Sequence, residues 1–374
     1  MIRSSRRQRA SWRRAALAMT ALAVATGGMV AATTVPASAA TGWVAQTPPN
    51  PAGTTFASLD GVSCSSATNC IAVGSQDPTN TESTALAEHW NGSAWALQTA
   101  VNPAGDTAVD LSGVSCPTAT FCMAVGFNQP SVGSSTAVAE SWNGSTWTLR
   151  APVSPAEAWP SAVSCTSSTN CEVVGTDSTG TLAEHWNGST WTTQTSPTPD
   201  GLTAVSCLSA SFCEATNDSD QAANWNGSTW SLQTTTSEYL LFSVSCATTT
   251  SCEATGYTDP DDPSAVAEHW NGSTWTNQIA NGTAAILWGV SCPAAAATCV
   301  AGGTESNPNG DGETIATGGY WSGSAWAQQA VALPSGALND NFQAISCPTT
   351  TFCIGVGDYE STAGNYWNFA GKWT

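Results

Sequence analysis

Positive charge is scarce in this sequence, and its placement confines it further. Lys and Arg account for 8 of the 374 residues, against 27 Asp and Glu. Beyond residue 14 only Arg150 and Lys372 remain, so that the rest of the chain has a formal net charge of −25. The other basic residues are Arg3, Arg6, Arg7, Arg9, Arg13 and Arg14. Because such an acidic chain repels phosphate backbones and anionic headgroups, we expect no nucleic-acid partner and no binding to a membrane surface.

Several catalytic signatures are also missing. The chain has 3 His, no Gly-x-Ser-x-Gly segment and no His-Glu-x-x-His segment, so it contains neither a nucleophile elbow nor a zincin helix. Two basic residues outside the N-terminus cannot form a sialidase-type arginine cluster or a cationic clamp for phosphoryl transfer. Paired carboxylates for glycoside hydrolysis stay open because acids are plentiful, although no pair stands out.

The first 39 residues have the three parts of a secretory signal peptide. Residues 1–14 are basic, residues 15–32 are rich in Ala, Val, Leu and Met, and Ala37-Ser38-Ala39 supplies a small-x-small cleavage pattern. The apolar run is short and broken, and no later run approaches the roughly 18 apolar residues of a spanning helix. We therefore expect export by the general secretory route, no membrane insertion, and one folded extracellular domain over residues 40–374.

Seven copies of one cysteine phrase divide that domain. In each copy Val-Ser-Cys or Ile-Ser-Cys is followed by a second cysteine after five residues, or after six in the sixth copy. In an exported chain this spacing indicates local disulfides that staple neighbouring strands, whereas a zinc site would need four thiols at tighter spacing. The predicted disulfides are Cys64–Cys70, Cys116–Cys122, Cys165–Cys171, Cys207–Cys213, Cys246–Cys252, Cys292–Cys299 and Cys347–Cys353.

Each copy also carries strand and turn signals. A Trp-Asn-Gly-Ser-x-Trp phrase follows the cysteines in the first five copies, as at Trp90–Trp95; the sixth has Ser in place of Asn, and Trp367–Trp373 is interpreted as a loosened seventh. Asn-Gly favours a tight hairpin turn, and we interpret these segments as turns although they match the glycosylation sequon. Four antiparallel strands per copy, in seven copies, predict an all-β fold: a seven-bladed β-propeller with one disulfide in each blade.

The ends of the domain indicate how the ring closes. The segment 41–48 resembles a fourth strand without its first three, and the chain stops where a fourth strand should begin. We therefore expect strand 41–48 to complete the last blade, with Trp43 and Trp373 competing for equivalent positions so that one is displaced. The blades are expected near residues 56–100, 107–152, 157–196, 200–235, 238–280, 284–331 and 338–374.

Two residue rows precede the first cysteine of each copy. Three positions before it stands Gly, Ala or Ser, as expected where inner strands converge on a central axis. Five positions before it stands an apolar residue that should pack between blades. These residues are Leu59, Leu111, Leu202, Leu241, Leu287 and Phe342, with Pro160 as the exception.

Repeated side chains are interpreted as structural. The Trp pairs and the Glu-His pairs before Trp90, Trp186 and Trp270 recur from copy to copy, whereas an active site needs different groups that converge once. We assign no catalytic residue. Non-repeated aromatic residues are therefore the candidates for ligand contacts: Trp159, Phe242 and Trp288 on inner strands, and Tyr257 and Tyr359 at the ends of second strands.

One polar loop imitates a calcium-binding loop. Residues 307–313 read Asn-Pro-Asn-Gly-Asp-Gly-Glu, which places Asn307, Asn309, Asp311 and Glu313 in the alternating order of oxygen ligands. Flanking helices are absent from the pattern, so a solvated polar loop is the alternative. We expect no cofactor apart from this weak calcium candidate.

The phrases Ser-Cys-x5-Cys-x-Ala-Val-Gly and Ala-Glu-His-Trp-Asn-Gly-Ser-Thr-Trp-Thr-x-Gln resemble those of secreted actinobacterial repeat proteins. The resemblance covers residues 41–374 and implies an exported propeller, but it carries over no catalytic residue. The leading hypothesis is a secreted, monomeric, non-enzymatic binding module with lectin-like recognition of a neutral glycan, or with a protein partner, at the cell surface. The alternatives are a secreted glycan-active hydrolase or lyase with its site at the channel mouth, and a structural or adhesive extracellular protein.

Overall fold

The computed structural model describes residues 42–374, except for residues 78–82, 104–105, 131–132, 151–156, 197, 199, 220, 237–238, 260–261, 280–284 and 308–312. The predicted signal peptide, residues 1–39, lies outside the described residues. Every named element of the described part is a β-strand, which confirms the all-β class. Within these ranges there is no helix that could cross a bilayer.

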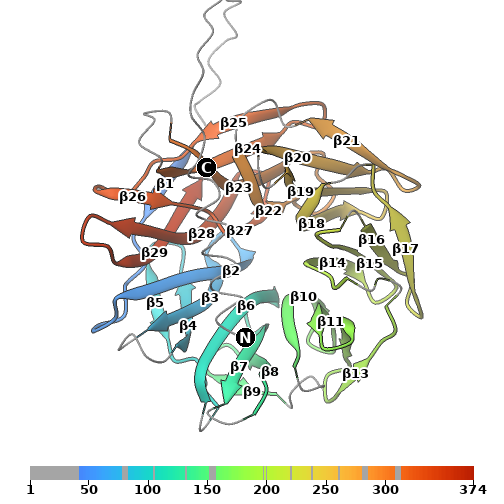
Figure 1. Ribbon diagram of the computed structural model, residues 1–374, viewed down its shortest axis with the longest axis horizontal. Helices are drawn as coiled ribbons and strands as arrows, with labels where there is room; N and C mark the ends of the chain where they lie inside the picture. Colours follow the sequence, from blue (N-terminus) through green and yellow to red (C-terminus); the bar gives the residue numbers. More distant parts are fainter. Residues whose placement is uncertain are drawn as a thin grey trace, which may run out of the picture.

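The strands form four-stranded antiparallel units, which we call blades and number in chain order. Five sheets have four strands each, and one nine-stranded sheet contains two more blades joined by a single parallel bridge between Phe56 and Tyr366. Figure 1 shows the blades arranged in a ring around one axis, with the first strand of each blade innermost. The predicted repetition of four-stranded units is therefore confirmed.

The strands of blades 1 to 7 follow in order of their distance from the axis. The first strands are β2 (Phe56–Ser66), β6 (Asp106–Thr118), β10 (Trp159–Ser167), β14 (Ala204–Ser209), β18 (Leu240–Thr248), β22 (Ala285–Ser291) and β27 (Ala344–Thr349). The second are β3 (Asn69–Asp77), β7 (Phe121–Pro130), β11 (Asn170–Asp177), β15 (Phe212–Thr216), β19 (Ser251–Asp259), β23 (Cys299–Ser306) and β28 (Phe352–Ser361). The third are β4 (Thr84–Trp90), β8 (Thr136–Trp142), β12 (Gly180–Trp186), β16 (Gln221–Trp225), β20 (Asp262–Trp270), β24 (Thr314–Trp321) and β29 (Tyr366–Trp373). The fourth are β5 (Trp95–Gln98), β9 (Trp147–Leu149), β13 (Trp191–Thr193), β17 (Trp230–Thr234), β21 (Trp275–Ile279), β25 (Trp326–Ala330) and β1 (Trp43–Gln46). An additional strand, β26 (Ala337–Asp340), precedes β27 and pairs with β28.

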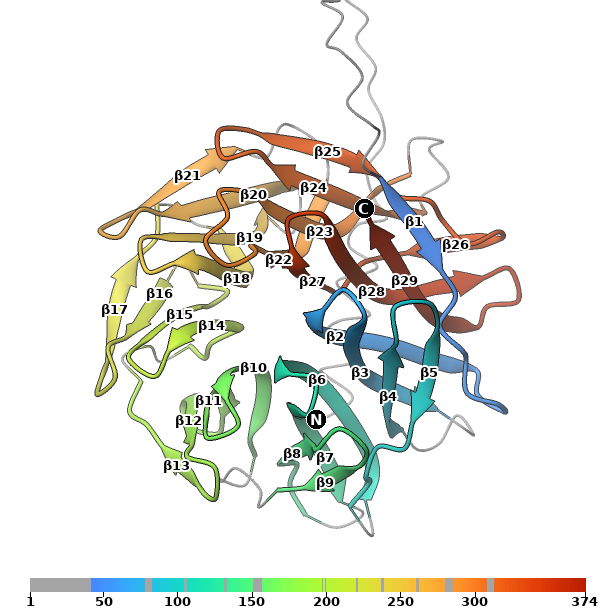
Figure 2. The same cartoon turned by 180° about the vertical axis from the view of Figure 1, so that it is seen from behind.

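The two ends of the chain meet in blade 7. β1 pairs with β29 in antiparallel register, as the sequence predicted, and Figure 2 shows the two strands side by side. The expected competition between Trp43 and Trp373 is wrong. These residues face each other across the two strands as Trp90 faces Trp95, so each fills its own position. The interpretation of Trp367–Trp373 as a hairpin is also wrong, because the whole segment lies on β29.

The core consists of apolar layers between successive blades. Leu111 of blade 2 packs with Ile71 and Val73 of blade 1, and Leu59 of blade 1 packs with Ile354 of blade 7. The predicted apolar row is therefore buried between blades, where it removes apolar surface from water at every interface. Since each sheet is covered on both faces by its neighbours, no blade has a complete core of its own.

The inner strands approach one another closely at the small-residue row. A Cβ added to Gly61 would lie 2.9 Å from the Cα of Gly113 in the next blade, and one added to Gly289 would lie 3.1 Å from the Cα of Ala344. These separations are below ordinary van der Waals contact, so a larger side chain would push the inner strands apart. The sequence prediction of little space at this row is confirmed.

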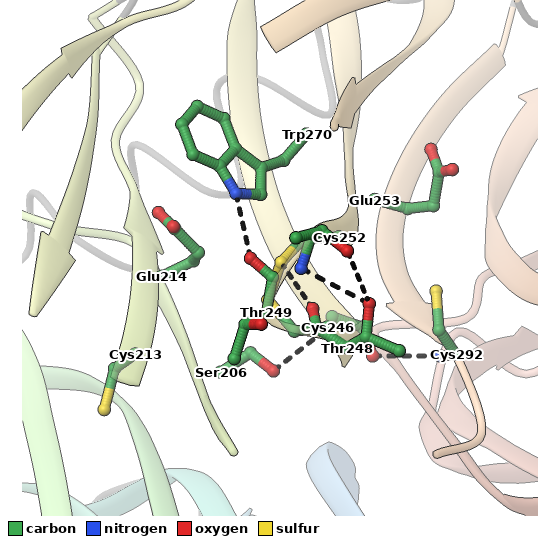
Figure 3. Close-up of a disulfide and its surroundings, with 12 residues drawn as sticks. Ser206, Cys213, Glu214, Cys246, Thr248, Thr249, Cys252, Glu253, Trp270 and Cys292 are labelled. Carbon is green, nitrogen blue, oxygen red and sulfur yellow. Dashed lines mark hydrogen bonds between the residues drawn. A yellow bond between two sulfur atoms is a disulfide. The ribbon is translucent and has the colours of Figure 1, made fainter. Parts of the chain in front are cut away.

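All seven predicted disulfides are present. The serine that precedes the first cysteine has a role that the sequence did not reveal. Its Oγ accepts a hydrogen bond from the backbone N of the first cysteine of the next blade, as from Cys246 to Ser206 at 3.0 Å (Figure 3). The bond from Cys64 to Ser346, at 2.9 Å, links blade 1 to blade 7. We call this set the serine ring: Ser63, Ser115, Ser164, Ser206, Ser245, Ser291 and Ser346.

Candidate functional site

Each inner strand carries one residue that leaves the regular pairing. In five blades the register skips one residue, which makes a β-bulge. In blades 4 and 7 the corresponding residue directly precedes the first paired residue of the inner strand. All of these residues are half-exposed, and each follows a buried residue. We call this set the inner rim: Asp60, Ser112, Ser161, Thr203, Phe242, Trp288 and Gln343.

Glycine on the second strand makes the bulge possible. A Cβ on Gly256 would lie 1.7 Å from the carbonyl oxygen of Leu240, and one on Gly303 would lie 1.8 Å from that of Ile286. The backbone of the inner strand therefore occupies the place of a side chain. This close approach explains the glycine of the Cys-x-Ala-Val-Gly phrase.

The inner rim is where the repeat loses its chemical uniformity. Five blades place Asp, Ser, Thr or Gln there, whereas the neighbouring blades 5 and 6 place Phe242 and Trp288. Their ring centroids are 5.0 Å apart in an edge-on arrangement. Tyr257 of β19 stacks on Phe242 at 5.6 Å and lies 6.3 Å from Trp288. These three residues are the aromatic cluster.

The structure thus brings together three of the five aromatic residues that the sequence singled out. Within the cluster Tyr257 is only 2% exposed, so it supports the other two rings from below and does not offer its own face. Trp159 begins β10 in blade 3, and Tyr359 packs in the layer between blades 6 and 7. The last two residues lie on other blades and do not join the cluster.

Behind the inner strands lies a layer of buried carboxyl groups that the sequence analysis recognised only in part. These glutamates are at most 1% exposed: Glu88, Glu140, Glu172, Glu184, Glu214, Glu253 and Glu268. Burial raises the pKa of Glu88 and Glu184 to about 8 and that of Glu140 and Glu214 to about 7.

The glutamates join neighbouring segments through hydrogen bonds. Asn368 of blade 7 donates to Glu88 of blade 1 at 2.6 Å, and the backbone N of Val101 donates to Glu140 at 3.0 Å. The expectation that they bind the indole of the adjacent Trp is not met by these bonds. The indole of Trp90 donates instead to the carbonyl of Ala67 in the turn between β2 and β3, at 3.2 Å.

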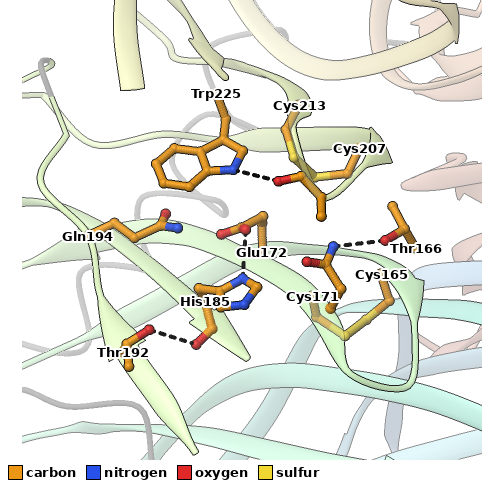
Figure 4. A network of polar contacts seen from close by, with 12 residues as sticks. Cys165, Thr166, Cys171, Glu172, His185, Thr192, Gln194, Cys207, Cys213 and Trp225 are labelled. Carbon is orange, nitrogen blue, oxygen red and sulfur yellow. Dashed lines mark hydrogen bonds and ion pairs between the residues drawn. A yellow bond between two sulfur atoms is a disulfide. The ribbon is translucent and has the colours of Figure 1, made fainter. Parts of the chain in front are cut away.

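Two histidines pair with this layer across strands. His185 Nδ1 lies 2.8 Å from Glu172 Oε1 (Figure 4), and His269 makes the same contact with Glu253. The partner is the glutamate of the second strand, not the one that precedes the histidine in the chain. Because the pairs repeat on separate blades, they cross-link strands within a blade, and the structural interpretation of the histidines is retained.

A pair of buried acids in blade 7 is the closest approach to an acid–base arrangement. Asp340 and Asp358 are each 1% exposed, and burial raises the pKa of Asp340 to about 6. Asn341 donates to Asp358 at 3.1 Å. Since neither carboxyl reaches the surface, no substrate can contact them, and we assign them no hydrolytic role.

The calcium candidate falls largely outside the described residues, because Asn309 and Asp311 belong to the range 308–312. At its ends the backbone N of Asn307 donates to the carbonyl of Glu313 at 2.9 Å, which closes the loop. Elsewhere in the described ranges no group of three His, Cys, Asp or Glu side chains could hold a metal ion. Calcium binding by the loop stays a prediction.

Comparisons with known proteins identify the fold. No family model matches the chain, and no curated protein matches it. Among solved structures, YCF48 bound to D1 peptide is 13% identical, with a TM-score of 0.59, over 91% of this chain and 98% of that chain. The WD40 β-propeller domain of Doa1 is 10% identical, with a TM-score of 0.56, over 85% and 97%. YCF48 from Cyanidioschyzon merolae is 12% identical, with a TM-score of 0.56, over 89% and 98%. At these identities the likeness shows the fold alone: the chain is built like a β-propeller.

Proposed function

We propose that this chain is a secreted, closed seven-bladed propeller that acts as a non-enzymatic binding module for a protein partner. Ring closure is supported by the pairing of β1 with β29 and by the hydrogen bond from Cys64 to Ser346. Secretion is supported by the disulfides, since such bonds persist in oxidising compartments outside the cytosol.

One observation carries the proposal: two half-exposed aromatic rings, Phe242 and Trp288, stand together on the inner rim, where other blades have small or polar residues. Large rings that are held in place supply much of the binding energy at protein interfaces. Here the bulged strands and the buried ring of Tyr257 fix the two rings before any partner arrives. Less conformational freedom is then lost on binding.

The surrounding charge favours a partner that is neutral or basic. Asp60 lies on the same inner rim, and Asp110 is half-exposed two positions before the rim residue of blade 2. Acidic groups at this end of the ring attract positive segments and repel acidic ones. The relative of known structure with the higher TM-score, YCF48, is itself bound to a peptide, which agrees with a protein ligand.

The test replaces each ring with the residue that the same position carries in other blades. Trp288→Ser and Phe242→Ser copy Ser112 and Ser161, so the bulge should form unchanged. We expect an array of basic and neutral peptides to yield ligands for the unaltered protein, and each substitution to weaken their binding at least tenfold. Trp159→Ser is the matched control, because that ring lies outside the cluster, and it should bind normally. Absence of any peptide ligand, or undiminished binding by Trp288→Ser, refutes the proposal.

A further inference from the structure

The opposite edge of the ring has a different chemical character. It carries the turns between first and second strands and between third and fourth strands, which we call the turn face. All these turns consist of neutral residues, such as Ser65-Ser66-Ala67-Thr68-Asn69 and Asn143-Gly144-Ser145-Thr146. All 27 acidic residues of the chain lie outside them. The turn face therefore presents hydroxyl and amide groups without charge.

These hydroxyl groups are held in place. Disulfides clamp the bases of the turns between first and second strands, and side-chain hydroxyls pair across most of their tips. The pairs are Ser66 with Thr68, Thr118 with Thr120, Ser167 with Thr169, Ser209 with Ser211, Thr248 with Thr250 and Thr349 with Thr351, at 3.2 to 3.5 Å. A polar ligand would meet a surface that is already ordered, which lowers the cost of binding.

A pocket of about 450 Å³ opens on this face between blades 2 and 3. Its size falls within the range of small-molecule sites. One wall is the hairpin of blade 2 and the other is the hairpin of blade 3, and the backbone N of Cys165 ties the second to Ser115 of the first at 2.9 Å. The lining includes Pro117, Thr118, Phe121, Thr166, Ser167 and Ser168.

The lining combines an apolar side with several hydroxyl groups and no charge. Phe121 is half-buried and Pro117 stands beside it, so together they offer an apolar surface. Thr118, Thr166 and Ser167 supply donors and acceptors. A pyranose ring has this complementary character, since its C–H face packs on aromatic rings while its hydroxyls hydrogen-bond. A phosphate, carboxylate or ammonium group would find no opposite charge in the pocket.

We propose that the pocket between blades 2 and 3 binds one pyranose unit of a neutral saccharide, and that two further blade interfaces offer the same site. The determining pair is an apolar residue after the first cysteine and a phenylalanine before the second. It occurs as Pro117 with Phe121, Leu208 with Phe212 and Pro348 with Phe352. Three weak sites on one face would bind a polysaccharide by avidity.

The blades without this pair show what its replacement does. In blade 1 the two positions are Ser65 and Asn69, whose side chains hydrogen-bond to each other at 2.8 Å. Blade 3 has Thr166 and Asn170 in the same bond. These hairpins keep the blade geometry with a polar pair, so exchanging the two kinds of pair should change the surface while preserving the fold.

The test measures saccharide binding by saturation-transfer NMR and calorimetry. The probes are the methyl pyranosides of glucose, galactose and mannose, N-acetylglucosamine, and neutral oligosaccharides of each, with glucuronic acid as the charged comparison. We expect neutral probes to bind and glucuronic acid to bind at least tenfold more weakly. The variant Pro117→Ser/Phe121→Asn should remove one of three sites, and the same exchange in all three blades should abolish binding.

Two controls keep the outcome interpretable. Phe121→Tyr retains the ring and should bind as the unaltered protein does, even if the exchanged hairpins fold poorly. Trp288→Ser alters the other face and should leave saccharide binding intact, so this inference and the proposed protein partner can fail separately. No binding of any neutral probe, undiminished binding by the triple exchange, or loss of binding in Trp288→Ser overturns the inference.

Discussion

The buried carboxyl of Glu88 makes the stability of this protein depend on pH in an uncommon direction. Its native pKa of about 8 lies above the ordinary value of 4.5. Between these pH values the native state retains a proton that the unfolded state has lost. The stabilisation is therefore complete below about pH 4.5 and is lost as the pH rises through 8. Most proteins with salt-bridged acids show the opposite trend.

The magnitude follows from the same displacement. Each unit of pH within this window removes about 1.4 kcal/mol for one such group. Between pH 5 and pH 8 Glu88 therefore lowers the free energy of unfolding by at most about 4 kcal/mol. Replacement by Gln removes the ionisable group while keeping an acceptor for Asn368, which donates to the carboxyl at 2.6 Å. Glu88→Gln should consequently gain stability relative to the unaltered protein as the pH rises.

The assay is denaturant unfolding of both proteins at pH 5, 6, 7 and 8, with disulfides intact. We expect the difference between the two stability curves to grow with pH towards the calculated limit. Asp200→Asn is the control, since Asp200 is exposed and its removal should leave the slope unchanged. Parallel curves for Glu88→Gln and the unaltered protein would mean that Glu88 is ionised in the native state, and the reasoning from burial would be refuted.

Three further predictions concern the architecture and are checked by thermal unfolding. Gly256→Ala should destabilise the protein by about 3 kcal/mol or more, because its Cβ would lie 1.7 Å from the carbonyl oxygen of Leu240; an unchanged Tm would contradict the bulge geometry. Ser206→Ala should cost about 1 to 2 kcal/mol, since the backbone N of Cys246 loses its acceptor in the neighbouring blade; no loss would mean that water substitutes fully. Replacing Cys246 and Cys252 together by Ser should cost about 2 to 3 kcal/mol, and a loss of all folded structure instead would show that the blades cannot tolerate one missing staple.

Much of the architecture could be predicted because the signals are local and repeated. Cysteines six residues apart can meet only across a tight hairpin, so the pairing of Cys64 with Cys70 follows from spacing alone. Asn-Gly at Asn91 marks the next turn in the same way. The separation between such signals sets strand length and order, and seven repetitions remove the ambiguity that a single copy would leave.

The prediction for the C-terminal blade failed for lack of that repetition. The seventh copy has no covalent turn between its third and fourth strands, so the phrase Trp367–Trp373 had no local signal to show that it is one continuous strand. The register of Trp43 against Trp373 depends on two segments at opposite ends of the chain. No spacing rule connects them.

The candidate site shows the same division. Non-repeated aromatic residues could be picked out, but their grouping could not: Phe242 and Trp288 are separated by a whole blade in sequence and meet because both bulge from adjacent inner strands. Trp159 looked equivalent and lies apart on β10. The pocket beside Phe121 was not predicted, because its second wall comes from the hairpin of the following blade.

The sequence by itself determined the strand class, the seven repeats, the disulfide partners and the joining of the chain ends, since each depends on composition or on short spacings. Only the tertiary structure decided which blade faces contact each other, which serine accepts from which cysteine, and which carboxyls are removed from water. The physical reason is that a blade cannot bury its own sheet. Its neighbours complete it, and contacts between neighbours join residues that are distant in the chain.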